Sequence, residues 1–350
     1  MLEVRHLKKY FPVQQTIGET LTRQPPKFVK AVDDVSFTLS KGEVLALVGE
    51  SGCGKTTIAK TLIGLEEQTA GEILFNGQEV DSAGRRAGAG LAQLEAPSGQ
   101  PPRESTAFPK VSMKRLRQQA QMVFQDPYES LNPRATIFDI VAEPLEVHGV
   151  ARKRPERLAR VKTALEEAGL RPPEDYLLRY PHELSGGQRQ RVVIASAMAL
   201  HPELLIADEP VSMLDVSVRA EILNLLRELR QKRGISLIFI THDLSTVAYF
   251  ADRIAVMYLG RIVEIGPTKS VLQNPQHPYT KALLSVIPVP NPRLRRQRVI
   301  LQGETPNPVN MPTGCRFHPR CPVAIDKCKQ IDPRLTPIAN AHEAACVLVG

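Results

Sequence analysis

Apolar and polar positions follow two different rhythms along this chain of 350 residues. Short apolar runs, and runs in which every second position is apolar, predict β-strands. These runs fall at 2–11, 32–39, 43–48, 203–207 and 235–240. Apolar positions at helical spacing predict α-helices over 57–65, 152–169, 192–200 and 218–233. Because strands alternate with helices, we expect an α/β fold in which a mainly parallel sheet is covered on both faces.

Three stretches depart from this alternation. Residues 12–30 are polar and include Pro25 and Pro26, which predicts a loop. Residues 82–110 are rich in Gly, Ala, Pro, Ser and Gln, which predicts a flexible insertion. Residues 266–350 hold four of the five cysteines and a second concentration of proline. We therefore expect a separate small module at the C-terminal end of the sequence.

The composition narrows the class of function. The formal net charge of +8 would suit nucleic acid, but no nucleic-acid-binding motif accompanies it and aromatic residues make up only 5% of the chain. We therefore expect no nucleic-acid partner. The first residues lack the apolar stretch of a signal peptide, and no apolar run approaches the ~18 residues of a membrane span. We expect a soluble chain that reaches a membrane only by docking.

Residues 49–56, Gly-Glu-Ser-Gly-Cys-Gly-Lys-Thr, match the phosphate-loop pattern G-x-x-x-x-G-K-[ST] in full. A predicted strand precedes the loop and a predicted helix follows it, as the motif requires. The glycines let backbone amides turn inward around a β-phosphate, Lys55 places its charge between the β- and γ-phosphates, and Thr56 offers a hydroxyl to Mg²⁺. The expected nucleotide-binding residues of this loop are Gly49, Ser51, Gly52, Gly54, Lys55, Thr56 and Thr57.

A second chemical signal lies where apolar runs end. The run 204–207 ends in Asp208 and Glu209, which a buried strand would present at its carboxyl end, where ligands collect in an open parallel sheet. We expect Asp208 to hold Mg²⁺ through water and Glu209 to be the general base for the attacking water. Gln125 and His242 also follow apolar runs. We expect Gln125 to coordinate Mg²⁺ or the attacking water, and His242 to reach the γ-phosphate.

Residues 184–188, Leu-Ser-Gly-Gly-Gln, supply a second anion-binding element. Ser185 and the amides of Gly186, Gly187 and Gln188 form a nest at the start of a predicted helix. One nucleotide cannot easily be held by this nest and by the phosphate loop of the same subunit. The sequence therefore predicts an ATP-dependent clamp, in which a partner subunit supplies the second receptor.

Together these segments resemble the ATP-binding subunit of an ABC transporter. Residues 49–56 resemble the Walker A motif, Gln125 the Q-loop, 184–188 the ABC signature, 204–209 Walker B, 212–215 the D-loop and His242 the switch histidine. The D-loop departs mildly, since Met213 stands where alanine is usual. The resemblance spans about residues 1–265. It implies a P-loop NTPase (RecA-like) core sheet with a small antiparallel β subdomain and a helical subdomain at about 126–185. It also implies an aromatic residue that stacks on adenine, which falls at Phe11 by spacing, with Tyr10 adjacent.

A finer resemblance, to the ATPases of oligopeptide/dipeptide importers, is carried by residues 125–134 and 274–283. It implies ATP hydrolysis that powers peptide import, at the cytoplasmic face of the inner membrane. The implied partners are a second ATPase, favoured as a paralogue, two transmembrane permease subunits and, indirectly, an extracytoplasmic solute-binding protein. The alternatives are an importer of nickel or another small solute and a soluble ABC ATPase without a transport role. The second is disfavoured because no coiled-coil heptads interrupt the core and only one phosphate loop occurs.

Four cysteines, Cys315, Cys321, Cys328 and Cys346, lie in the predicted C-terminal module. A loop with little apolar content usually needs a metal to fold, and a cytosolic chain is not expected to keep disulfides. Zinc prefers closely spaced pairs of cysteines, whereas the spacing C-x5-C-x6-C-x17-C favours a [4Fe–4S] cluster. Resemblance to the peptide-importer ATPases implies the same cluster. Zinc and free thiols stay open as alternatives.

Overall fold

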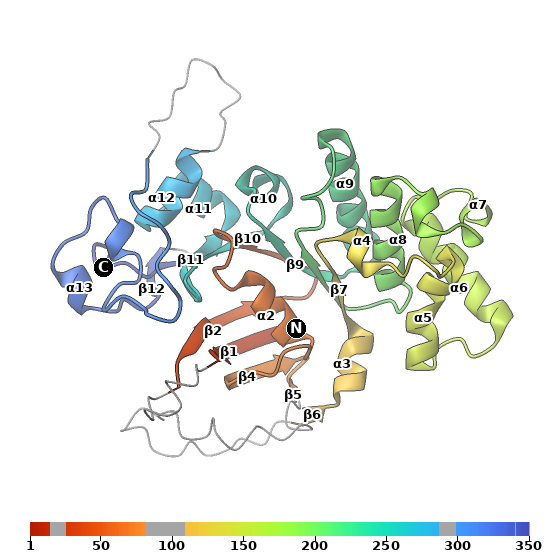
Figure 1. Ribbon diagram of the computed structural model, residues 1–350, viewed down its shortest axis with the longest axis horizontal. Coiled ribbons are helices and arrows are strands. Elements are labelled where there is room, and N and C mark those ends of the chain that lie inside the picture. The colour runs from red at the N-terminus through yellow and green to blue at the C-terminus, as the bar shows by residue number, and fades with distance from the viewer. Residues whose placement is uncertain (15–25, 81–108, 287–298, 340, 350) are drawn as a thin grey trace.

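A computed structural model describes residues 1–14, 26–80, 109–286, 299–339 and 341–349. It contains a large and a small β-sheet, with helices on both sides of the large sheet and an arm of helices at one end (Figure 1). The predicted insertion lies outside the described residues, except for its last two positions. In the described ranges, no helix is both long enough and apolar enough to cross a membrane.

The large sheet has the strand order β12-β13-β11-β10-β3-β9-β8-β7. Its strands are β3 (Val44–Val48), β7 (Ala120–Val123), β8 (Leu204–Asp208), β9 (Ser236–Thr241), β10 (Arg253–Tyr258), β11 (Arg261–Pro267), β12 (Thr336–Ala339) and β13 (His342–Ala344). The five strands from β10 to β7 run parallel, which confirms the predicted parallel core. The other three pair antiparallel at one edge.

The central strands are apolar at almost every position because both of their faces are covered. In β3, Leu45 and Leu47 pack toward the small sheet, whereas Ala46 and Val48 pack into the opposite cluster with α10 and α12. Successive side chains point to opposite faces of a strand, so a strand covered on both sides needs a continuous apolar run. This explains the runs that predicted β3, β8 and β9 from the sequence.

The small sheet has the order β2-β1-β4-β5-β6. Its strands are β1 (Leu2–Pro12), β2 (Phe28–Leu39), β4 (Ala70–Phe75), β5 (Gln78–Val80) and β6 (Lys110–Val111). The pairs are antiparallel except β5–β6, which is parallel. The strand expected at 32–39 begins earlier, at Phe28, because its first residues pair with the end of β1. Residues 28–30 therefore belong to a strand and not to the predicted loop.

The helices follow the predicted pattern with shifted starts. They are α2 (Lys55–Leu62), α3 (Met113–Gln119), α4 (Pro127–Ser130), α5 (Ile137–His148), α6 (Arg154–Glu167), α7 (Glu174–Leu177), α8 (Gly186–Met198), α9 (Val216–Arg233), α10 (Leu244–Phe250), α11 (Thr268–Gln273), α12 (Pro278–Ser285) and α13 (Lys327–Gln330), with short 3₁₀ turns η1 (Pro181–Glu183) and η2 (His318–Arg320). Helix α8 starts six residues before the predicted 192–200 segment, because Ser185 caps it. The first turn of α8 is polar, so the apolar periodicity does not indicate where this helix begins.

The C-terminal residues extend the large sheet. Strand β13 pairs with β11, with Glu264 opposite Ala344 and Ile265 opposite Glu343. Phe317 is buried in the same cluster as Tyr258 and Tyr279. The separate small module stays a prediction, and its residues share the sheet and the core of the main body.

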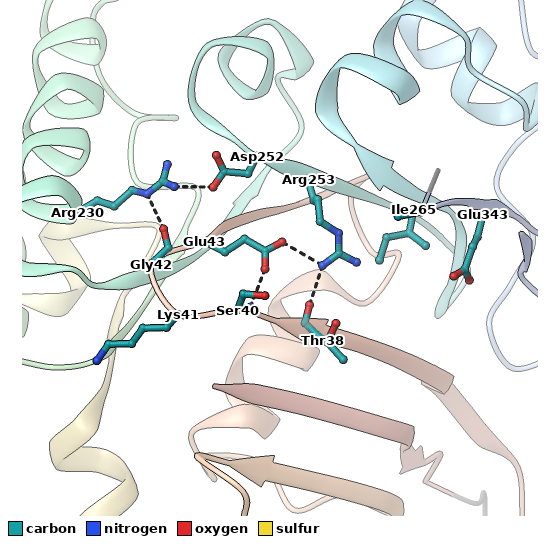
Figure 2. A pocket seen from close by; sticks show the side chains of 11 residues that line it. Thr38, Ser40, Lys41, Gly42, Glu43, Arg230, Asp252, Arg253, Ile265 and Glu343 are labelled. Atoms are coloured by element: carbon teal, nitrogen blue, oxygen red, sulfur yellow. Dashed lines mark hydrogen bonds and ion pairs between the residues drawn. The ribbon is translucent and has the colours of Figure 1, made fainter. Parts of the chain in front are cut away.

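A hollow of about 600 Å³ lies at the amino ends of β3 and β10, away from the carboxyl ends of the parallel strands (Figure 2). Two of its basic side chains, those of Arg230 and Arg253, are occupied by internal partners. Arg230 binds the carbonyl of Gly42 at 2.8 Å and Asp252 at 2.7 Å, and Arg253 binds Glu43 at 3.0 Å. These contacts tie α9 and β10 to the turn before β3, which indicates a structural junction.

Candidate active site

The carboxyl ends of four neighbouring strands bring the predicted site residues to one edge of the large sheet. Strand β3 leads into the phosphate loop, β7 into Gln125, β8 into Asp208 and Glu209, and β9 into His242. In an open parallel sheet this edge is where ligands bind. The four strands are adjacent in the order β3-β9-β8-β7, and the loop after β3 leads directly into α2.

The phosphate loop needs its glycines for two physical reasons. Gly54 has φ +108°, and a Cβ there would lie 2.1 Å from the Ala31 carbonyl oxygen. Gly49 has φ +154°, and its Cβ would lie 2.3 Å from the carbonyl oxygen of Met257. Side chains at these positions would push the loop away from β2 and β10 and strain its backbone.

Most of the predicted loop residues line a pocket of about 550 Å³. Its lining comprises Val29, Ala31, Ser51, Gly52, Gly54, Lys55, Thr56, Thr57, Gln125, Glu209, His242 and Pro308. Lys55 is buried, and its ammonium group donates to the carbonyls of Gly49 at 2.8 Å and Glu50 at 3.0 Å. A cation held over inward-facing loop amides suits the phosphates of a nucleotide.

Asp208 fits the role of a magnesium ligand. It is only 2% exposed, and its Oδ1 has no hydrogen-bond partner among the described residues. Burial and the adjacent charge of Glu209 raise the pKa of Asp208, while the Thr56 hydroxyl and Lys55 oppose this shift. A buried carboxylate oxygen without a partner is costly unless a cation binds it. Asp208 and Thr56 together present the oxygen donors that Mg²⁺ prefers.

Glu209 lies between Gln125 and His242. Its Oε2 accepts a hydrogen bond from Gln125 Nε2 at 3.3 Å, and its Oε1 lies 3.2 Å from His242 Nδ1. The Glu209 backbone has φ +46°, in the left-handed region, and is held by bonds to Ile240 and Ser212. Strain of this kind persists where the surroundings fix it, often at functional sites. The three predicted catalytic side chains therefore meet.

The signature residues form a helix end outside this pocket. The Ser185 hydroxyl accepts from the Gln188 amide at 3.3 Å, and Gln188 Oε1 accepts from the Ser185 amide at 3.0 Å. This capping box starts α8 and aims the amides of its first turn, including Gly186 and Gly187, out of the helix end. Among the described pocket-lining residues, none comes from 185–188. The two predicted phosphate receptors are thus not brought together within one chain.

The structure separates the two aromatic candidates for adenine stacking. The Tyr10 hydroxyl donates to Asp33 at 2.5 Å, so this side chain is tied to its neighbour strand. Phe11 lies opposite Val29 in the β1–β2 register. Residues directly opposite each other in an antiparallel pair share a face of the sheet. Val29 lines the pocket but Phe11 is not among its described lining residues, and the Lys9 Nζ lies 4.6 Å from the centre of the Phe11 ring.

The four C-terminal cysteines gather in one region. All five cysteines of the chain are free thiols. Burial raises the pKa of Cys315 to about 11, and neighbouring Cys328 and Cys346 add to this shift. In the described part of the chain, no three His, Cys, Asp or Glu side chains are close enough to hold a single metal ion.

Three contributors to the pocket were not predicted from the sequence. Val29 lies in the segment 12–30 that we expected to be a loop, Ala31 lies between that loop and the predicted strand, and Pro308 comes from the C-terminal region. Only the apolar alternation at 29–32 could have indicated the first two. Nothing near Pro308 in the sequence indicates a nucleotide site, because its place there depends on how the C-terminal region folds back.

The phosphate loop makes this chain a P-loop ATPase. The signature residues 184–188 at the start of α8 narrow the class to ABC ATPases. A family model described as ABC transporter matches residues 32–212, and the chain belongs to this family of ATP-hydrolysing transporter subunits. A second model, described as the C-terminal region of oligopeptide/dipeptide transporters, matches residues 263–328.

Similar proteins carry related names. A putative peptide import ATP-binding protein of Brucella ovis is 45% identical over 347 residues, which cover 99% of this chain and 97% of that protein. The oligopeptide transport ATP-binding protein AppF of Bacillus subtilis is 45% identical over 350 residues, with the same coverage. Among solved structures, the dimeric ATP-binding cassette MJ0796 bound to ADP and Pi aligns with a TM-score of 0.59 at 25% identity, covering 77% of this chain and 99% of that one.

Proposed function

We propose that this chain binds and hydrolyses ATP to power an ABC importer of di- and oligopeptides, as a peripheral subunit at the cytoplasmic face of the inner membrane. The match of residues 263–328 to the oligopeptide/dipeptide transporter region carries the substrate class. The named peptide importers extend the similarity over 99% of the chain. The remaining partners would be two permease subunits and an extracytoplasmic solute-binding protein.

The site residues divide the chemistry of hydrolysis between them. Lys55 and the loop amides hold the phosphates, while Thr56 and Asp208 hold Mg²⁺, which neutralises charge on the phosphates when it is bound. Glu209 accepts the hydrogen bond of the attacking water and aims it at the γ-phosphate. His242 and Gln125, which contact Glu209, sense whether the γ-phosphate is present. Phe11 stacks on adenine.

Each complete site needs two subunits. The helix end at Ser185 offers amides and a hydroxyl to an anion, yet lies outside the pocket of its own chain. A head-to-tail partner would place this helix end against the γ-phosphate, and the similar cassette MJ0796 is dimeric in its structure with ADP and Pi. We propose a paralogous ATPase as the partner in the transporter.

The clamp is tested by trapping it with ATP. Glu209→Gln removes the base but leaves the phosphate loop intact, so hydrolysis should fall by about 10²–10⁴-fold while ATP binding persists. Light scattering should then detect an ATP-dependent dimer of this variant, or a heterodimer with the partner ATPase. Adding Ser185→Arg, which blocks the helix end without touching the pocket, should abolish the dimer. Full hydrolysis by a strictly monomeric chain would refute the clamp.

We further propose that Cys315, Cys321, Cys328 and Cys346 hold a [4Fe–4S] cluster. The four thiols influence one another electrostatically, and burial raises the pKa of Cys315, Cys321 and Cys346. Such thiols stay protonated without a metal, and iron would bind them as thiolates. The cluster would staple a region that has little regular secondary structure. Zinc remains the alternative metal for these four thiols.

A further inference from the structure

An arginine of the four-cysteine region forms an ion pair with a residue of the phosphate loop. Arg320 is the last residue of the 3₁₀ turn η2 between Cys315 and Cys321, and its Nη1 and Nη2 lie 2.8 and 3.2 Å from the two carboxylate oxygens of Glu50. Glu50 is the second residue of the loop. A two-point contact between guanidinium and carboxylate fixes orientation as well as distance. The C-terminal region therefore holds one end of the loop that binds phosphate.

The same carboxylate has a second partner from the C-terminal region. The Thr305 hydroxyl donates to Glu50 Oε2 at 2.8 Å and also accepts from Arg320 Nη1 at 3.2 Å. The Arg320 side chain is 10% exposed and that of Glu50 is 29% exposed. Although partial burial acts to raise the pKa of Glu50, the hydrogen bonds from Arg320 and Thr305 hold it below its usual range. Glu50 is thus ionised and bound on two sides.

The backbone beneath this pair is also anchored. The Glu50 amide donates to the Tyr279 hydroxyl at 2.9 Å, from α12. The Tyr279 ring packs against Tyr258 and Phe317, with centroids 4.8 and 5.4 Å away. Phe317 lies in the segment between Cys315 and Cys321, so the fold of that segment sets where Arg320 points. The anchor is rigid because the three rings are almost completely buried.

The C-terminal region reaches the pocket at a second point. Pro308 lines the nucleotide pocket beside Val29 and Ala31 of β2. Its carbonyl accepts a hydrogen bond from the Lys30 amide at 3.3 Å, which fixes it against that strand. The phosphate end and the β2 side of one pocket are therefore both bounded by residues 305–320.

We propose that Arg320 and Thr305 are positioning residues for nucleotide binding, which act through Glu50, so that nucleotide occupancy and the folding of residues 299–331 are linked. The inference rests on the proposed nucleotide site. Linkage is reciprocal: whatever orders this segment tightens nucleotide binding, and bound nucleotide orders the segment to the same extent. Folding of the segment that carries three of the four cysteines would then control the nucleotide affinity of the ATPase.

The test measures binding of a fluorescent ADP analogue with Mg²⁺ to the full chain. Arg320→Ala should weaken binding by about tenfold, the effect of losing a charged two-point contact. Arg320→Lys should restore part of the affinity, and adding Glu50→Gln to Arg320→Ala should cause little further loss. In the assembled ATPase the KM for ATP should rise while kcat at saturation is kept within about twofold, because Glu209 and His242 are untouched.

Arg334→Ala is the matched control. Arg334 also ties this region to the main body, through Asp34, but its side chain is 65% exposed and it does not line the pocket. It should leave nucleotide affinity unchanged. Hydrogen exchange supplies the reciprocal measurement: Mg-ADP should protect amides within 299–331 in the unmodified chain and should protect them less in Arg320→Ala.

The outcomes separate this inference from the proposed function. If the unmodified chain binds no nucleotide, both are overturned. If folded Arg320→Ala binds as tightly as the unmodified chain, or if Arg334→Ala weakens binding equally, only the positioning role is overturned. Should Arg320→Ala not fold, Glu50→Gln removes the same ion pair while keeping the arginine packed, and unchanged affinity in that variant overturns the role equally.

Discussion

At the scale of single residues, the adjacent acids Asp208 and Glu209 have different environments. Asp208 ends a buried strand, and burial raises its pKa. Glu209 turns into the left-handed region and faces Gln125 and His242 in the pocket. Two carboxylates in different surroundings can take different tasks, which supports the proposed roles of a metal ligand and a base. The sequence could predict both acids, but the backbone turn that separates their roles is visible only in the structure.

The cysteine proposal gives the first prediction at this scale. Protein purified without oxygen should be brown and hold about four iron atoms per chain, as a [4Fe–4S] cluster requires. Cys328→Ser should remove the colour and most of the iron, because Cys328 is buried among the other three thiols. Cys53→Ser is the matched control, since this thiol lies in the phosphate loop, and it should keep the iron. A colourless protein with stoichiometric zinc would contradict the cluster.

At the scale of elements, caps decide where several helices begin. Ser185 starts α8 and thereby forms the helix end that we propose as the second phosphate receptor. His277 starts α12: its Nδ1 accepts from the Tyr279 amide at 3.1 Å, while its own amide donates to the buried Glu264 at 2.9 Å. This helix carries the tyrosine that holds Glu50. Its start therefore affects the phosphate loop, and the histidine cap makes it sensitive to pH.

The second prediction concerns that cap. Burial, with a smaller contribution from the charge of Lys281, lowers the pKa of His277 from 6.5 to about 3. Below about pH 6.5 the unfolded chain binds a proton that the folded chain does not, so His277 lowers the free energy of unfolding as pH falls toward 3. The slope is at most about 1.4 kcal/mol per pH unit.

The variant His277→Asn keeps an acceptor for the Tyr279 amide but cannot take up a proton. Denaturant unfolding between pH 4 and 8 should show that the free energy of unfolding of this variant depends less on pH than that of the unmodified chain. Above pH 7 the two proteins should show nearly the same pH dependence. Equal slopes throughout the acid range would show that His277 is not kept neutral in the folded chain.

At the scale of the whole molecule, the small sheet, the large sheet and the C-terminal region share one ion-pair network. Asp33 of β2 accepts hydrogen bonds from Tyr10 and from Arg316, which also donates to the Leu259 carbonyl. Arg261 lies 3.8 Å from the same carboxylate. Asp33 is buried and the Arg316 side chain is only 9% exposed, so the three parts depend on one another for stability.

The third prediction is that Arg316→Met destabilises the protein by about 2–3 kcal/mol, because it leaves a buried carboxylate with fewer partners. The midpoint of thermal unfolding should fall by several degrees. Adding Asp33→Asn should recover part of the loss, since the buried charge is then removed. Arg334→Met, which breaks the more exposed pair with Asp34, should cost less than about 1 kcal/mol. Equal losses for the two single variants would contradict the importance of burial.

Features encoded in short segments could be predicted from the sequence alone. A phosphate loop, a capped signature and acids at a strand end each act through neighbours within a few positions, so Lys55, Ser185, Asp208 and Glu209 could be predicted as site residues before any fold was known. Continuous apolar runs determined the parallel sheet for the same reason, since two buried faces leave no polar position in a central strand.

Contacts between distant segments became visible only in the folded chain. Residues 266–350 differ from the rest in composition, yet β13 joins the large sheet and Arg320 reaches Glu50, 270 positions earlier. No local pattern encodes such contacts, because they depend on the packing of Phe317 against two tyrosines from other elements. Propensity and periodicity act over single elements, whereas ion pairs and ring contacts across elements form only when the whole chain has folded.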